Sequence, residues 1–200
     1  MSLRTSYRFL APIYDQAVEK PLRRARLRSL GALPAGRAQL VLLDGVGTGL
    51  DLPHLPAVHR YVGVDLTRAM LDRARARRGG LSVDLVEGDS QALPFPDACF
   101  DHAILHLILA VVPDPARCLG ECARVLKPGG TVLILDKFLR HGERAWLRRA
   151  LNPLARRIAT RTDVVFEDVL ASAPTLRLID DQPALAGGWF RCIRLMRQPD

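Results

Sequence analysis

The chain has 200 residues, of which 48% are hydrophobic, and this length and composition predict one globular domain with a substantial core. Its longest apolar stretch, residues 103–112, is interrupted by a histidine and is far shorter than the roughly 20 residues of a membrane span. The N-terminus shows no secretory signal pattern, and the four cysteines have neither metal nor disulfide spacing, so we expect a reduced, cytoplasmic protein without a bound metal.

The net charge of +8 comes almost entirely from arginine, and the arginines are clustered. The clusters lie in residues 23–28, 68–78 and 140–161. A basic surface favours an acidic partner, which can be nucleic acid, anionic lipid or an acidic substrate. Composition alone leaves these three open.

Residues 7–30 show the periodicity of an amphipathic helix, and Tyr14 lies on its apolar stripe. We therefore predict a single domain over residues 1–200, in which a helical N-terminal cap segment (1–36) precedes the core (37–200). Such a segment can cap a binding site, lie on a membrane or simply pack on the core.

The clearest motif is a short, wholly apolar run followed by alternating glycines. Residues 40–44 are too few for a helix and predict a strand that is buried on both faces of a parallel sheet. The glycines that follow predict a tight turn in which no Cβ blocks a ligand: Gly45, Gly47 and Gly49. A second strand, residues 61–65, ends in the carboxylate of Asp65. A glycine turn after one strand and an acid at the tip of the next are how a doubly wound sheet holds a nucleoside.

The same patterns predict the other elements. Strands are expected over residues 82–87, 100–105, 131–135, 176–180 and 190–196, and helices over residues 51–55, 68–78 and 115–126. His106 falls at the carboxyl end of the fourth strand, the edge where open α/β sheets bind ligands. Residues 139–160 form a second amphipathic, arginine-rich region.

Taken in order, these motifs resemble those of class I S-adenosylmethionine-dependent methyltransferases. The resemblance covers residues 40–136, about half of the chain. It rests on the glycine turn, Asp65, Gly88–Phe95, Phe100-Asp101 and Arg124–Gly130. A dinucleotide-binding turn would need a glycine where this chain has Leu50. The resemblance implies an α/β fold, namely a Rossmann-like doubly wound seven-stranded sheet with an antiparallel last strand and a helical N-terminal extension. It also implies S-adenosylmethionine as cofactor and S-adenosylhomocysteine as product.

The resemblance further implies a cofactor site. Its expected members are Tyr14, Asp44, Gly45, Gly47, Gly49, Asp65, Leu66, Met70, Asp89, Ser90 and His106. Asp65 would accept hydrogen bonds from the ribose hydroxyls and Asp89 from the adenine amino group. Tyr14 belongs to a lid segment in similar enzymes, and Tyr14 and His106 are the candidate catalytic residues.

One position departs from the family pattern. The family carries an acidic residue two positions before the first glycine, where this chain has Leu43, and the acid stands one residue later at Asp44. Neighbouring side chains of a strand point to opposite faces of the sheet. Asp44 therefore reproduces the family's contact near the methionine amino group only if the turn starts early.

Within the family, the chain is most similar to bacterial phospholipid (phosphatidylethanolamine) N-methyltransferases and their quinone-methylating relatives. This likeness rests on Gly45–Leu50 with Pro53, Val111–Pro115 and Phe138. It implies a lipid or small-molecule acceptor, with a phospholipid amine favoured. Asp136-Lys137 stands where the phospholipid enzymes commonly have an Asn-His pair. A soluble quinone or small-molecule methyltransferase and a cofactor-binding, non-catalytic homologue therefore stay open. An RNA methyltransferase would rest on charge alone, and no nucleic-acid partner is expected.

Both arginine-rich segments adjoin the carboxyl edge of the predicted sheet, where an acceptor would enter. We expect reversible contact with the anionic inner face of a membrane, with Trp146 inserted and Arg144, Arg148 and Arg149 on lipid phosphates. The alternative is that Trp146 packs inward and the acceptor is soluble. The polar groups expected near this edge are Tyr14, His106, Asp136 and His141, and none has a spacing that marks it as a base.

Overall fold

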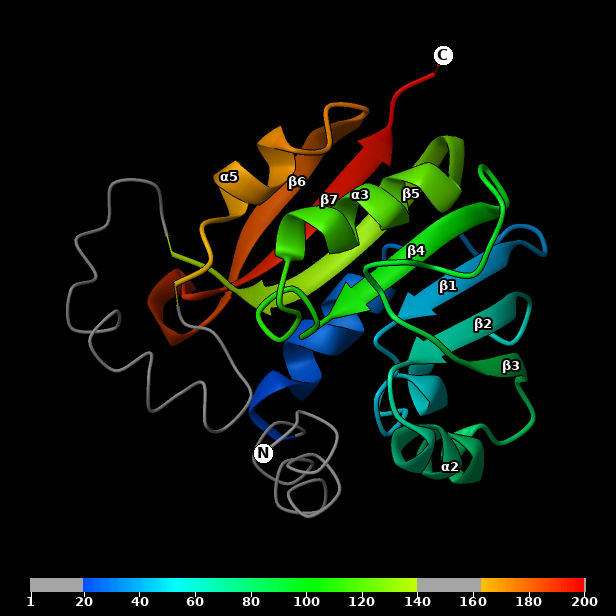
Figure 1. The fold of residues 1–200 in the computed structure, drawn as a ribbon. Coiled ribbons are helices and arrows are strands. Elements are labelled where there is room, and N and C mark those ends of the chain that lie inside the picture. Colours follow the sequence, from blue (N-terminus) through cyan, green and yellow to red (C-terminus); the bar gives the residue numbers. More distant parts are fainter. Residues whose placement is uncertain (1–19, 140–162, 200) are drawn as a thin grey trace.

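The strands form one sheet with helices on both of its faces, in a computed structural model that describes residues 20–139 and 163–199 (Figure 1). In chain order the described strands are β1 (Leu40–Asp44), β2 (Arg60–Asp65), β3 (Ser82–Glu87), β4 (Phe100–His106), β5 (Leu126–Lys137), β6 (Leu176–Leu185) and β7 (Phe190–Arg197). The described helices are residues 20–30, the 3-10 helix η1 (Leu52–His54), α2 (Arg68–Arg77), α3 (Pro115–Val125), α5 (Phe166–Ala171) and the 3-10 helix η2 (Ala186–Gly188).

The strand order in the sheet is β3-β2-β1-β4-β5-β7-β6. The first five strands are parallel, and β7 lies antiparallel between β5 and β6. This confirms the predicted Rossmann-like, doubly wound sheet with an antiparallel last strand. The order reverses between β1 and β4, and in open α/β sheets ligands bind at the carboxyl ends of the strands beside such a reversal.

Two elements are longer than the sequence predicts. β5 begins at Leu126 rather than residue 131, because Leu126 pairs with Phe100 before an irregularity in the β4–β5 register. β6 continues to Leu185, since it pairs with β7 across two register shifts. The helix expected over residues 51–55 is the shorter η1, for which Asp51 is the N-cap.

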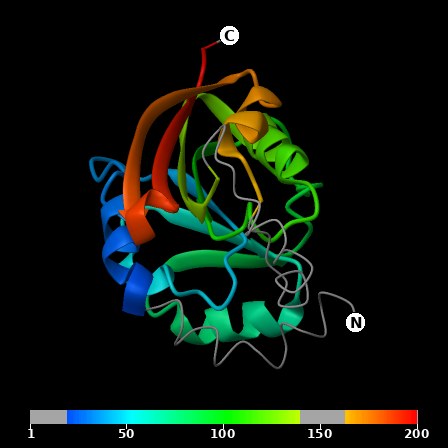
Figure 2. The same ribbon diagram turned by 90° about the vertical axis from the view of Figure 1, so that its left-hand side faces the viewer.

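Helices cover both faces of the sheet (Figures 1 and 2), and each face has its own apolar core. On one face, α3 and α5 pack on the sheet, and the cluster there includes Leu42, Leu119 and Phe166. Cys118 and Cys122 belong to it as free thiols, as expected for small core residues. On the other face, residues 20–30 and α2 cover the sheet, and the cluster joins Leu30 to Val41 and Ala74. None of the described helices combines the length and apolar character that crossing a bilayer requires.

Several predictions from the sequence concern residues outside those that the structure describes. These are the structure of residues 1–19 and 140–162, with Tyr14, His141, Arg144, Trp146, Arg148 and Arg149.

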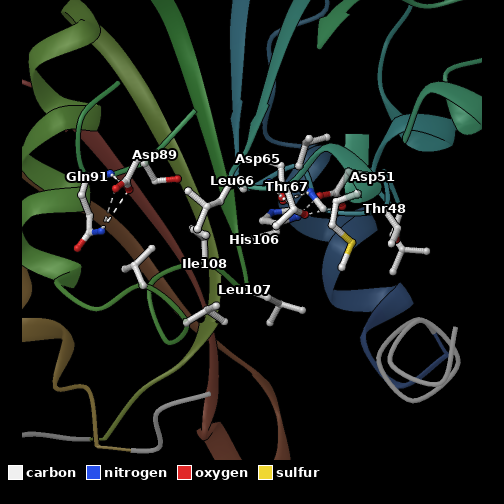
Figure 3. Close-up of a pocket in the computed structure, with 18 of the residues that line it drawn as sticks. Thr48, Asp51, Asp65, Leu66, Thr67, Asp89, Gln91, His106, Leu107 and Ile108 are labelled. Carbon is white, nitrogen blue, oxygen red and sulfur yellow. Dashed lines mark hydrogen bonds and ion pairs between the residues drawn. The ribbon is translucent and has the colours of Figure 1, made fainter. Parts of the chain in front are cut away.

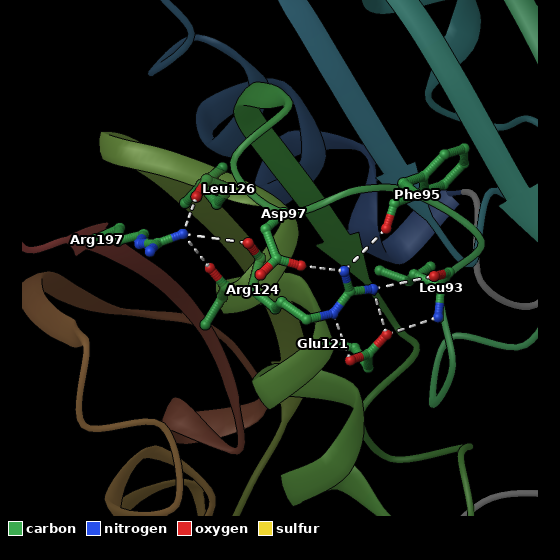
Figure 4. A network of polar contacts seen from close by, with 8 residues as sticks. Leu93, Phe95, Asp97, Glu121, Arg124, Leu126 and Arg197 are labelled. Atoms are coloured by element: carbon green, nitrogen blue, oxygen red, sulfur yellow. Dashed lines mark hydrogen bonds and ion pairs between the residues drawn. The ribbon is translucent and has the colours of Figure 1, made fainter.

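The motif residues Arg124–Gly130 and Leu93–Phe95 form a structural network away from the sheet's carboxyl edge (Figure 4). Arg124 donates to the backbone oxygens of Leu93 and Phe95 and pairs with Glu121 at 2.7 Å. Arg197 of β7 donates to the backbone oxygens of Ala123, Arg124 and Leu126. The network fixes the end of α3 to the loop that follows the third strand. These motifs therefore hold the scaffold rather than a ligand.

Gly49, the third glycine of the turn, packs against helices rather than lining a cavity. Its φ is +80°, and a Cβ there would lie 2.8 Å from Leu52 Cδ1 and 2.9 Å from Ala74 Cα. The backbone of α2 cannot move away cheaply, so a side chain at this position is strained both by conformation and by contact.

We predict that Gly49→Ala lowers the free energy of unfolding by about 1–3 kcal/mol. Gly120→Ala is the matched control, because Gly120 lies within α3 and a Cβ there meets nothing within 4 Å. The control should be neutral or stabilising by up to about 1 kcal/mol. Urea unfolding of the three proteins measures both values, and equal stability of the two variants would contradict the packing role of Gly49.

Candidate active site

A pocket opens at the carboxyl ends of β1, β2 and β4, at the reversal in strand order (Figure 3). Its lining residues are Arg26, Gly45, Val46, Gly47, Thr48, Leu50, Asp51, Asp65, Leu66, Thr67, Met70, Asp89, Ser90, Gln91, His106, Leu107, Ile108, Val111, Val112 and Pro113. The polar side chains gather in two places. Figure 3 shows Asp89 and Gln91 at one end, Asp51, Asp65 and His106 at the other, and apolar side chains between them.

The turn after β1 can lie against the segment after β4 because Gly45 has no side chain. A Cβ on Gly45 would lie 2.7 Å from Ile108, and its φ of +72° favours glycine. Ile108 and Leu107 follow directly after β4, and Leu107 itself has a φ of +61°, a conformation that is rare for a residue with a side chain. The turn at Gly45 and the segment after β4 are therefore in close contact, with no space between them for a side chain at position 45.

Asp65 joins this turn to the end of β2. Its Oδ2 accepts from Gly47 N at 3.1 Å, and its Oδ1 accepts from Thr67 N at 2.9 Å and from Thr67 Oγ1 at 3.1 Å. Burial raises the pKa of Asp65, and the hydrogen bonds from Thr67 and Gly47 oppose that rise. Because a carboxylate has about four acceptor sites, Asp65 keeps capacity for a ligand in the pocket.

At the other end, the loop after β3 carries an exposed carboxylate. Asp89 Oδ1 accepts from Gln91 N at 2.9 Å and from Gln91 Nε2 at 3.1 Å. Gln91 Oε1 in turn accepts from Asp114 N, the N-cap residue of α3. The loop is thus tied to α3 and holds Asp89 at the pocket, where Asp89 Oδ2 has only a contact of 3.5 Å with Gln91 Nε2 among the described residues.

The acid in the first strand is buried and is not among the described residues that line the pocket. Ser90 Oγ donates to Asp44 Oδ1 at 2.5 Å, and Cys118 Sγ lies 3.7 Å from Asp44 Oδ2. Burial raises the pKa of Asp44 to about 7, although the hydrogen bonds from Ser90 and Cys118 lower it. Ser90 itself lines the pocket, so Asp44 reaches the pocket through Ser90.

The segment that forms the apolar wall is anchored by a second buried acid. Asp136 Oδ2 accepts from Ala110 N at 3.0 Å, and Leu107 N donates to Leu135 O at 2.8 Å. Asp136 is fully buried at the end of β5, so it acts on the shape of the wall and not on its surface. The wall that it supports consists of Leu107, Ile108, Val111, Val112 and Pro113.

His106 is buried between two partners. Its Nδ1 lies 3.0 Å from Asp51 Oδ2, and its Nε2 lies 2.9 Å from Ser29 Oγ. Because a carboxylate only accepts, Nδ1 carries the proton in the neutral ring and Nε2 accepts from Ser29. Asp51 also forms an ion pair with Arg26.

Most residues expected at the site do line this pocket: Gly45, Gly47, Asp65, Leu66, Met70, Asp89, Ser90 and His106. Asp44 and Gly49 lie behind it, and Tyr14 lies outside the described residues. The sequence analysis missed Arg26 and Asp51. A signal was present, because Arg26 is the charged residue on an inward stripe of residues 20–30 whose other members are Leu22, Ala25, Ser29 and Leu30. Within the described residues, no cluster of histidine, cysteine, aspartate or glutamate could hold a metal ion.

The chain is similar to known methyltransferases. A family model described as a methyltransferase domain matches residues 42–134. A phosphatidylethanolamine N-methyltransferase of Cereibacter sphaeroides is 34% identical over 191 residues, which cover 93% of each chain. A 2-phytyl-1,4-naphtoquinone methyltransferase of Synechococcus elongatus is 33% identical over 199 residues, covering 88% of this chain and 83% of the relative. A solved S-adenosylmethionine-dependent methyltransferase of Mesorhizobium loti superposes with a TM-score of 0.68 at 18% identity, over 90% of this chain and all of that one, which shows a shared fold.

The buried acid predicts a pH-dependent stability. Since the pKa of Asp44 is about 7 in the folded chain and 3.8 ordinarily, the folded protein holds a proton that the unfolded chain has released between these values. Asp44 therefore lowers the free energy of unfolding as pH rises through that window, by up to about 4 kcal/mol.

Asp44→Asn removes the titration, so its stability relative to the unmodified chain should increase between about pH 4 and about pH 7. Asp84→Asn, at an exposed position of β3, is the control and should show a constant difference. Urea unfolding at both pH values measures the effect. A difference for Asp44→Asn that does not change with pH would contradict the argument.

Proposed function

The chain belongs to the class I S-adenosylmethionine-dependent methyltransferases, and from that premise we propose that it methylates a lipid, with a phospholipid amine as the favoured acceptor. As an enzyme of this family it uses S-adenosylmethionine and releases S-adenosylhomocysteine. The observation that carries the choice of acceptor is the part of the apolar wall that we do not assign to the cofactor, namely Leu107, Val111, Val112 and Pro113. An acyl chain or an isoprenoid is better accommodated beside these side chains than a strongly hydrated molecule.

The residues present fit the cofactor. Gly47 lines the pocket, and a Cβ built on it would come no closer than 3.9 Å to another group (Gly45 O), so the backbone of the turn is open to a ligand there. We assign Asp65 to the ribose hydroxyls and Asp89 to the adenine amino group, with Leu66, Met70 and Ile108 against the faces of the adenine ring. Bound S-adenosylmethionine would supply an electrophilic methyl group on its sulfonium sulfur, and the neutral thioether of S-adenosylhomocysteine would be the leaving group. The protein then contributes alignment and exclusion of water.

An amine or phenol acceptor must lose a proton, and His106 is the candidate base in this proposal. Asp51 fixes the tautomer with the proton on Nδ1 and stabilises the ring when it becomes positive, as a carboxylate does in a catalytic triad. Nε2 is already hydrogen-bonded to Ser29. His106 therefore accepts a proton from an acceptor only when the Ser29 hydroxyl turns away. Tyr14, from the proposed lid segment, is the second candidate.

A quinone-type acceptor is the second candidate function. It is supported by the likeness to the naphthoquinone methyltransferase over most of both chains. Asp136-Lys137, which replaces the Asn-His pair of phospholipid enzymes, does not separate the two readings. Asp136 is buried and supports the wall, so its effect on the acceptor is indirect.

The outer face of residues 20–30 supports contact with an anionic membrane. Lys20, Arg23, Arg24 and Arg28 are exposed on it, and Leu27 is exposed between them. Each basic residue near an anionic bilayer contributes about 1 kcal/mol, and an exposed leucine can enter the headgroup layer. We propose that this face brings the pocket to the acceptor at the membrane surface.

One vesicle experiment tests both proposals. The protein is incubated with methyl-labelled S-adenosylmethionine and phosphatidylcholine vesicles that contain phosphatidylethanolamine, a demethylated naphthoquinol or neither, each with and without phosphatidylglycerol. We expect label in phosphatidylethanolamine, and more of it when phosphatidylglycerol is present. A variant with Arg23→Glu and Arg24→Glu should lose that gain and should sediment less with anionic vesicles at low salt.

Each of the other outcomes contradicts one part of the proposed function. Label only with the naphthoquinol replaces the phospholipid by the quinone reading. No label with either acceptor, although S-adenosylmethionine binds, favours a soluble acceptor or a non-catalytic homologue. Equal labelling with and without phosphatidylglycerol would remove the membrane contact.

A further inference from the structure

An arginine lies on the inward face of residues 20–30 and reaches the pocket. Arg26 is 6% exposed, and its neighbours on the same face are Leu22, Ala25, Ser29 and Leu30. A buried guanidinium is costly unless its charge and its donors are matched. Its presence on a mainly apolar face, where Ser29 is the other buried polar residue of this helix, therefore calls for partners in the pocket.

Among the described residues, the charged partner of Arg26 is Asp51. Arg26 Nη1 lies 2.6 Å from Asp51 Oδ1, at the start of η1, and Asp51 also contacts His106. Burial alone would raise the pKa of Asp51, but His106 and Arg26 together hold it well below its ordinary range. Asp51 is thus an anion beside the cation of Arg26, and both side chains line the pocket.

The guanidinium is only partly used by this pair. Arg26 Nε is buried and has no hydrogen-bond partner among the described residues. A buried donor without a partner is rare, so the described residues do not fully satisfy this guanidinium, and a ligand in the pocket that Arg26 lines can meet its remaining donors. Asp51 likewise keeps acceptor capacity, since its side chain is 14% exposed and its two oxygens contact only Arg26 and His106 in the described part of the chain.

A cation and an anion side by side select a particular ligand chemistry. A phosphate or a simple carboxylate at Arg26 would be repelled by Asp51, and a simple cation at Asp51 would be repelled by Arg26. An α-amino acid zwitterion carries one charge of each sign about as far apart as this pair, so it satisfies both residues. The methionine end of S-adenosylmethionine has this form.

We propose that Arg26 binds the α-carboxylate and Asp51 the α-ammonium of the methionine end of S-adenosylmethionine. The proposal rests on the proposed cofactor binding, and it explains how the chain dispenses with an acid at position 43. Leu43 is buried in the apolar cluster that also holds Leu30 and Leu52, so no polar group stands there. The carboxylate comes instead from Asp51, on the far side of the glycine turn.

Two ligands separate this role from general cofactor binding. S-adenosylhomocysteine carries the amino-acid end, whereas 5′-methylthioadenosine shares its adenosine and thioether but lacks that end. Calorimetric titration of both ligands is compared for the unmodified chain, Arg26→Gln, Asp51→Asn and Arg24→Gln. Arg24 is the control because it is exposed on the same helix.

Arg26→Gln and Asp51→Asn should each weaken S-adenosylhomocysteine by about tenfold or more, because each removes a hydrogen bond between charged groups. Both should leave the affinity for 5′-methylthioadenosine within about twofold, since that ligand has no group for this pair. Arg24→Gln should change neither. Arg26→Lys, which keeps the charge but not the planar fork, should fall between.

Each other result is decisive. If the unmodified chain binds neither ligand, the proposed cofactor binding fails and this inference fails with it. If it binds both and the two variants lose both ligands equally, or lose neither, the pair has a structural role only and cofactor binding stands. Circular dichroism melting identifies a variant that does not fold. If Arg26→Gln is such a variant, Asp51→Asn and Arg26→Lys decide by the same comparison.

Discussion

The hydrogen bond from Gly47 N to the carboxylate of Asp65 ties the turn after β1 to the end of β2. The arrangement of the pocket depends on it. The turn needs glycines to pass beneath Ile108, and a flexible glycine turn needs an outside contact to hold one conformation. Asp65 supplies that contact and keeps lone pairs for a ligand. The acid that organises the turn is therefore also the one we assign to the ribose.

The rest of the pocket is built by acids that do not line it. Asp44 holds Ser90 from behind, and Asp136 holds the backbone of the apolar wall. Burial raises the pKa of both. Burying each carboxyl group costs free energy of hydration, which hydrogen bonds from backbone or hydroxyl donors partly offset. These hydrogen bonds hold the neighbouring segments in place and so fix the shape of the pocket. The surface of the pocket is left to Asp51, Asp65 and Asp89, whose oxygens can meet a ligand.

Local sequence patterns predicted much of this structure. The features that they missed depend on contacts between residues far apart in the sequence. The apolar runs predicted the bounds of β1 to β4 closely, because each run is flanked in the sequence by turn residues that end the strand locally. The early start of β5 depends on pairing between Leu126 and Phe100, which no local pattern contains. The alternation of side chains along β1 correctly raised the question of which face Asp44 points to. No local pattern could show that Gly49 packs against Ala74, or that Arg26 forms an ion pair with Asp51.

The most direct test of the account is titration of the protein with S-adenosylhomocysteine, comparing Asp65→Ala with Asp72→Ala. Asp72 is a suitable control because its carboxylate pairs with Arg68 and Arg75 on the exposed side of α2. The account predicts one site in the unmodified chain, an affinity about tenfold or more weaker for Asp65→Ala, and no change for Asp72→Ala. No binding to the unmodified chain at about millimolar ligand, or equal affinities of the two variants, would contradict it.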